Sequence, residues 1–138
     1  MYTIENSADF PHLSPQFFDW IESEWGNPQS ADEKMVPDSI PTPLFAIEND
    51  VLLGGLSFTT HLKPDSEVTG IWINTLYVAP DSRKRGIGAA LIEAASEKAK
   101  QLNIDELYVY TDKPEIYEKH GWAIVKIVDD HTVLTKSF

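Results

Sequence analysis

The sequence contains no cysteine in its 138 residues. Disulfide bonds, thiolate metal sites and a cysteine nucleophile are therefore excluded. No stretch approaches the roughly 20 apolar residues that a membrane-spanning helix needs. Residues 1–6 carry neither a basic segment nor an apolar run, so no signal peptide is expected and the predicted location is cytoplasmic. The four histidines are too scattered to show metal-ligand spacing, so no metal is expected.

Positive charge is also scarce, because 11 Lys and Arg residues stand against 22 Asp and Glu residues, a formal net charge of −11. This balance argues against nucleic-acid binding, which normally uses a basic face. An acidic surface would favour encounter with cationic substrates, although acidity can also serve solubility alone. Three of the few cations, Arg83, Lys84 and Arg85, are consecutive, which is a local reversal of sign.

Residues 1–138 are expected to form a single domain, because no linker, repeat or low-complexity segment interrupts them. The hydrophobic pattern predicts the order strand, helix, looped region, three strands, helix, strand, helix and two strands. This order predicts an α/β (α+β) fold, a mixed sheet with helices on both faces. The expected strands cover 2–5, 44–48, 51–61, a segment ending at 78, 105–111, 122–128 and 132–136, and the expected helices cover 14–26, 89–102 and 114–120.

Several local signals refine this order. Ser14 is expected to be the N-cap of the first helix, with Pro15 at its first helical position. Four prolines in 27–43 predict a shaped loop there, with room for a helical turn at 31–35. Two consecutive glycines within the second hairpin strand, Gly54 and Gly55, predict a bulge or a close backbone approach.

The most informative segment is residues 83–88, Arg-Lys-Arg-Gly-Ile-Gly, which lies between an apolar strand, 71–78, and a strong helix-forming stretch, 89–102. Glycines let the backbone turn tightly and approach a ligand closely. The start of the helix directs unpaired N–H groups and a positive dipole end toward that ligand. The segment therefore indicates a phosphate-binding loop, although a solvated turn is the ordinary alternative for a run of cations.

Two common phosphate loops do not match. A dinucleotide-binding turn, Gly-x-Gly-x-x-Gly, needs a glycine where Leu91 stands, and the Gly-Lys-Ser/Thr of an ATP-binding loop is missing. The pattern that does match is Arg-x-x-Gly-x-Gly after Leu-Tyr-Val-x-Pro, in 76–88. It resembles the acetyl-CoA-binding motif of the GCN5-related N-acetyltransferase (GNAT) superfamily. Residues 117–122 resemble the Tyr-x-x-x-Gly-aromatic segment of that family, and the likeness covers nearly the whole chain.

The resemblance implies that acetyl-CoA is the co-substrate. The backbone amides of 83–89 are expected to hold its pyrophosphate, and the side chains of the three cations to add charge, reaching toward the 3′-phosphate. The pantetheine arm is expected to pair with 76–78, where that strand separates from the strand ending at Thr111. The cofactor-binding residues so implied are Leu76, Tyr77, Val78, Arg83, Lys84, Arg85, Gly86, Ile87, Gly88, Ala89, Thr111 and Tyr117.

Tyr117 is the expected general acid by this resemblance, since a phenol with a pKa of about 10 is protonated at neutral pH and can donate to a thiolate. The alternative is a core tyrosine packed with Trp122. The identity of the general base is left open, because residues 71–75 carry no carboxylate. Glu67 and His61 are the side-chain candidates, and both could equally be solvent-exposed strand ends. A relay of waters and backbone carbonyls is a further option.

The sequence thus predicts an acetyl-CoA-dependent N-acetyltransferase that acts by direct transfer in a ternary complex, because no cysteine can carry an acyl group. The acceptor is a primary amine of a small molecule or a peptide, and the acidic chain favours a cationic one. The alternative is a non-catalytic module that binds acyl-CoA as a signal. We expect a monomer or homodimer with neither nucleic-acid nor membrane partners.

Overall fold

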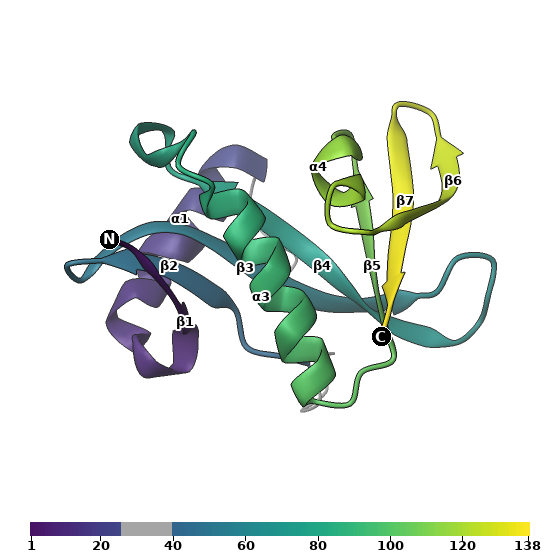
Figure 1. Cartoon of the computed structure of the whole chain (residues 1–138), viewed down its shortest axis with the longest axis horizontal. Helices are drawn as coiled ribbons and strands as arrows, with labels where there is room; N and C mark the ends of the chain where they lie inside the picture. Colours follow the sequence, from purple (N-terminus) through teal and green to yellow (C-terminus); the bar gives the residue numbers. More distant parts are fainter. Residues whose placement is uncertain (26–39) are drawn as a thin grey trace.

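The computed structural model describes residues 1–25 and 40–138 of the chain (Figure 1). The predicted loop lies for the most part outside the described residues, and so does its expected helical turn at 31–35. The other predicted strands and helices are present, with ends shifted by one or two residues in most cases. The predicted order of elements is therefore confirmed wherever the structure describes the chain.

The described residues build one mixed seven-stranded sheet in the order β1-β2-β3-β4-β5-β7-β6. The first four strands form an antiparallel meander, β4 and β5 run parallel, and β5, β7 and β6 are again antiparallel. The mixed sheet is thus as predicted. The strands are β1 (Thr3–Asn6), β2 (Leu44–Glu48), β3 (Val51–Leu62), β4 (Thr69–Val78), β5 (Glu106–Thr111), β6 (Ala123–Val128) and β7 (His131–Ser137).

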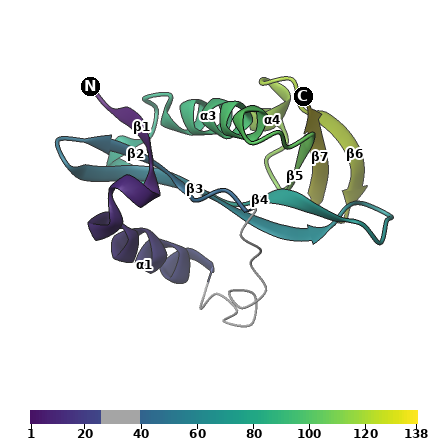
Figure 2. The same ribbon diagram turned by 90° about the horizontal axis from the view of Figure 1, so that it is seen from below.

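Helices lie on both faces of the sheet, as predicted (Figure 2). Helix α1 (Ser14–Trp25) covers one face, and α3 (Ile87–Gln101) and the short α4 (Glu115–Glu118) lie on the other. Among the helices of the described residues, none combines the length and apolar character needed to cross a membrane. The sheet therefore has one face toward α1 and an opposite face toward α3 and α4.

Two apolar clusters hold these layers together. The larger lies between α3 and the sheet and includes Leu91, Leu107 and Leu134, all fully buried. The smaller lies under α1, where Phe17 packs against Phe45 with ring centroids 5.3 Å apart. A Cβ on Gly55 would lie 2.5 Å from the ring of Phe17. A close approach is one of the two alternatives, with a bulge, that the sequence predicted for these glycines.

The start of α1 differs from the prediction. Ser14 has helical backbone angles, φ −61° and ψ −41°, so it lies within the helix and is not its N-cap. The chain enters α1 from a 3-10 turn, Pro11–Leu13, and the amide of Ser14 donates to the carbonyl of Pro11. Because this amide already has a backbone partner, the helix continues the preceding turn without a capping side chain.

Candidate active site

Strands β4 and β5 separate within the sheet. Their parallel ladder has three residue pairs and ends at Ile73 and Val109, while β4 continues to Val78. The separation coincides with a bulge, because Ser57 and Phe58 of β3 pair with Thr75 and Ile73, which leaves Asn74 with no opposite residue. A bulge bends its strand. Beyond Ile73, alternate residues of β4 direct their N–H and C=O groups toward the opening, where an extended ligand could pair with them.

The N-terminus of α3 lies next to the end of β4. Its cap residue, Gly86, has a φ of +78°, a left-handed conformation that favours glycine. The first backbone bond of the helix runs from Ala90 to Gly86. Among the described residues, the amides of 87–89 have no backbone partner. Three free amides at a helix start form a site that fits a pyrophosphate.

The three cations of this loop differ in their contacts. Arg83 donates from Nε to the carbonyl oxygen of Val78 at 2.9 Å. Arg85 pairs with Glu48 at 3.2 Å, and Glu48 also contacts the N-terminal ammonium at 2.7 Å. The N-terminal ammonium and Arg85 together hold the pKa of Glu48 below its ordinary value. Lys84 is exposed, and among the described residues its ammonium has neither a hydrogen bond nor an ion pair.

Tyr117 lies in α4 and is only 3% exposed. Its ring packs edge-on against Trp122, with centroids 5.3 Å apart. Burial raises the pKa of the Tyr117 phenol well above its ordinary value, so the hydroxyl stays protonated and can donate. The Tyr117 ring is therefore part of the core, as the packing alternative predicted. This does not conflict with a general-acid role, which concerns the hydroxyl and stays a prediction.

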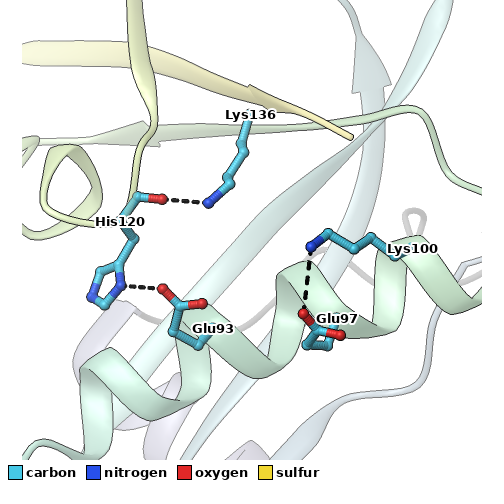
Figure 3. Close-up of polar contacts among 5 residues, drawn as sticks. All are labelled: Glu93, Glu97, Lys100, His120 and Lys136. Atoms are coloured by element: carbon cyan, nitrogen blue, oxygen red, sulfur yellow. Dashed lines mark hydrogen bonds and ion pairs between the residues drawn. The ribbon is translucent and has the colours of Figure 1, made fainter.

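The end of α4 is tied to neighbouring elements by His120 (Figure 3). Its Nδ1 contacts a carboxylate oxygen of Glu93 on α3, and the Lys136 ammonium donates to its carbonyl oxygen. Gly121 follows with a φ of +86°, a left-handed conformation that favours glycine. These contacts fix the segment that carries Tyr117 against α3 and β7.

A pocket of about 660 Å³ lies on the sheet face opposite α3. Asn74 of β4 and Tyr110 of β5 both line it, and each lies one residue beyond the last pair of the β4–β5 ladder. The pocket therefore begins where the two strands separate. Its lining residues come from the β3–β4 hairpin and from β5, β6 and β7: Thr59, Thr60, His61, Leu62, Lys63, Pro64, Asp65, Ser66, Trp72, Ile73, Asn74, Tyr110, Lys126, Val128 and Val133.

The two predicted base candidates lie in different surroundings. His61 lines the pocket, and its ring packs edge-on against Trp72, with centroids 5.7 Å apart. The indole nitrogen of Trp72 donates to the carbonyl of His61 at 3.1 Å. Glu67 is exposed in the β3–β4 turn and is not one of the lining residues. The structure brings only His61 to the pocket.

Sequence reasoning missed a third group, which contacts a lining residue of this pocket. The ring of His131 lies parallel to that of Tyr110, with centroids 4.6 Å apart and planes 15° apart. Nδ1 of His131 is 2.8 Å from a carboxylate oxygen of Asp130. The sequence showed only an Asp-His pair in a hairpin turn, and no spacing rule connects that pair with Tyr110. No group of three or more His, Asp or Glu side chains within 1–25 and 40–138 could hold a metal ion.

Comparison with known proteins shows the family and the fold of this chain. Residues 5–122 match the acetyltransferase (GNAT) family, so the chain belongs to that family and the resemblance is confirmed. Arabidopsis thaliana Naa50 in complex with the bisubstrate analogue CoA-Ac-MVNAL has the same fold, with a TM-score of 0.69, 20% identity and 99% of each chain covered. Aminoglycoside 6'-acetyltransferase type Ii aligns with a TM-score of 0.74 and 22% identity over 98% of this chain and 96% of the other.

Proposed function

We propose that this acetyltransferase takes the acetyl group from acetyl-CoA and passes it to a primary amine of a small molecule or a peptide, by direct transfer in a ternary complex. The observation that carries the proposal is the opening between β4 and β5. The β4–β5 ladder ends at Ile73 and Val109, the pocket begins one residue further at Asn74 and Tyr110, and the three free amides at the start of α3 follow the end of β4. Two substrates entering from opposite sides can therefore meet within the sheet, and positioning of this kind supplies much of a rate enhancement.

The donor side uses the loop and the end of β4. The amides of 87–89 bind the pyrophosphate, and Lys84 supplies charge to a further phosphate. The backbone of 76–78 pairs with the pantetheine arm, with Thr111 on the other side of the opening. When bound, the thioester supplies an activated acetyl group. The phenol of Tyr117 donates its proton to the departing sulfur, which its protonated state allows.

The acceptor side is the pocket on the opposite face. An amine is an ammonium ion at neutral pH and must lose a proton before it can attack. Of the predicted bases, His61 is the one that lines the pocket. The names of the similar proteins point to two acceptor types, a peptide and an aminoglycoside. The net charge of −11 favours a cationic acceptor of either type. We include in the proposal that residues 1–138 act as one N-acetyltransferase domain.

The test is free-thiol release from acetyl-CoA with four amines: spermidine, kanamycin, lysine and a short peptide with a free N-terminus. Stimulation by one of them supports the enzyme and identifies the acceptor class. The matched control is Gly86→Val, which should bind no acetyl-CoA in calorimetry and release no thiol. Tight coenzyme A binding by the wild type without stimulated release from any amine would favour the acyl-CoA-binding module.

A further inference from the structure

His131 is not one of the lining residues, but its neighbours on the same face of the sheet line the pocket. Val128 of β6 is directly opposite His131, and Val133 is two residues further along β7. Residues at these positions share a face of the sheet. Both line the pocket, as does Tyr110, on which the His131 ring stacks. Three neighbours of this imidazole, from β5, β6 and β7, therefore belong to the pocket wall.

The imidazole is oriented by a carboxylate. Asp130 Oδ1 lies 2.8 Å from Nδ1, so the neutral ring places its proton on Nδ1 and its lone pair on Nε2. The hydrogen bond from His131 holds the pKa of Asp130 below its ordinary value, which keeps the carboxylate ionised. The side chain of His131 is 34% exposed, so the imidazole is partly open to solvent. An Asp-His pair of this kind is suited to accept a proton.

We propose that His131, oriented by Asp130, is the base that removes the proton from the acceptor ammonium, directly or through one water. This inference rests on the proposed N-acetyltransferase function. Position favours His131 over His61. His61 pairs with Gly70, four residues before Asn74 on β4, which is roughly 13 Å at about 3.3 Å per residue. The His131 ring instead stacks on Tyr110, which is one residue beyond the last β4–β5 pair.

The proton balance is complete with the groups described. The acceptor ammonium gives one proton to Nε2 of His131, and the neutral amine forms the new C–N bond to the acetyl carbon. The C–S bond breaks, and the sulfur takes a proton from the phenol of Tyr117. The phenolate recovers the surplus proton from the new amide nitrogen. The imidazolium, stabilised by Asp130, releases its proton to solvent.

The charged and titratable groups around His131 come from three places. Asp130 and Asp129 lie in the β6–β7 turn, Tyr110 lies on β5, and Lys126 lies on the same face of β6, opposite Val133. Lys126 is paired with Asp65 at 3.3 Å. A pH profile of the reaction must therefore be compared between variants that leave Tyr110 and Lys126 in place.

The experiment compares two acceptors that differ in their need for a base. One is the amine of the four above that gives the fastest thiol release, and the other is hydroxylamine, which is already neutral at pH 7. His131→Gln should lower kcat/KM for the amine on the order of 10²-fold and leave hydroxylamine unchanged. Asp130→Asn should lower kcat/KM for the amine by a smaller factor, because the imidazole of His131 remains. The deficit of both variants should shrink as the pH rises and the amine loses its proton unaided.

The competing variant is His61→Gln, which removes the other histidine that is a candidate for the base. Calorimetric binding of coenzyme A and circular dichroism report on the fold of each variant. The proposal is overturned if His61→Gln loses the amine reaction while His131→Gln keeps it. It is also overturned if His131→Gln loses both acceptors equally, because that pattern reports a structural role. If the wild type turns over neither acceptor, the proposed function itself fails, and the role of His131 fails with it.

Discussion

The side chain of Arg83 donates a hydrogen bond from Nε to the carbonyl oxygen of Val78, at 2.9 Å. Its guanidinium also lies 5.8 Å from the centre of the Tyr77 ring. The first cation of the glycine-rich loop therefore ties that loop to the end of β4. Since this end of β4 borders the opening, the contact aligns the amides of 87–89 with the strand that should hold the pantetheine arm.

Arg83 and Lys84 should respond differently to removal of their charge. Arg83→Gln should weaken coenzyme A binding and also lower the free energy of unfolding by about 1 kcal/mol, because it removes a hydrogen bond within the protein. Lys84→Gln should weaken coenzyme A binding without changing the free energy of unfolding. The difference in affinity between this variant and the wild type should shrink at high salt. Calorimetry and urea unfolding measure the two effects. Equal loss of stability in both variants would contradict the assigned roles.

Gly86→Val should abolish acetyl-CoA binding. A β-branched residue at a φ of +78° is strained, and its side chain would occupy the space in front of the free amides. Gly88→Ala is the control for folding of a loop variant, because a Cβ there would lie 4.0 Å from the Val78 side chain, an ordinary van der Waals contact. Binding is measured by calorimetry on variants shown to be folded. Unchanged affinity in folded Gly86→Val would rule out the phosphate-binding assignment.

Tyr117→Phe should lower kcat on the order of 10²-fold and leave acetyl-CoA affinity nearly unchanged, because it removes the donor hydroxyl and keeps the ring. Packing against Trp122 is retained, so the free energy of unfolding should change little. Tyr117→Ala is the contrasting variant, since it should cost about 3–5 kcal/mol of stability by opening a cavity. Full activity in Tyr117→Phe would leave only the core role for this residue.

The pair between Lys63 and Glu106, 2.9 Å apart, should give stability a defined pH window. The pair lowers the pKa of Glu106, so its contribution is present above the unfolded pKa and is lost as the pH falls through the folded one. The same pair raises the pKa of Lys63, so that contribution is lost as the pH rises through the folded value. Glu106→Gln should flatten the acid side of urea-unfolding curves measured across pH. An unchanged acid limb would contradict this account.

Much of the fold could be predicted because its signals are local. The hydrophobic pattern marked the strands and helices, and the paired glycines at 54 and 55 marked a close approach that the structure shows at Phe17. The start of α1 was predicted wrongly at Ser14, because the preceding 3-10 turn supplies a backbone partner that a capping rule does not consider. The roles of Lys84, Tyr117 and the other site residues remain predictions that the experiments above address.

By itself, the sequence determined the family of this protein, the order of its elements and the position of its glycine-rich loop, since each depends on neighbouring residues along the chain. Only the tertiary structure decided where β4 and β5 separate, which of Glu67 and His61 reaches the pocket, and that His131 stacks on Tyr110. These relationships depend on strand register. Register is set by packing between segments far apart in the sequence, so no local pattern encodes it.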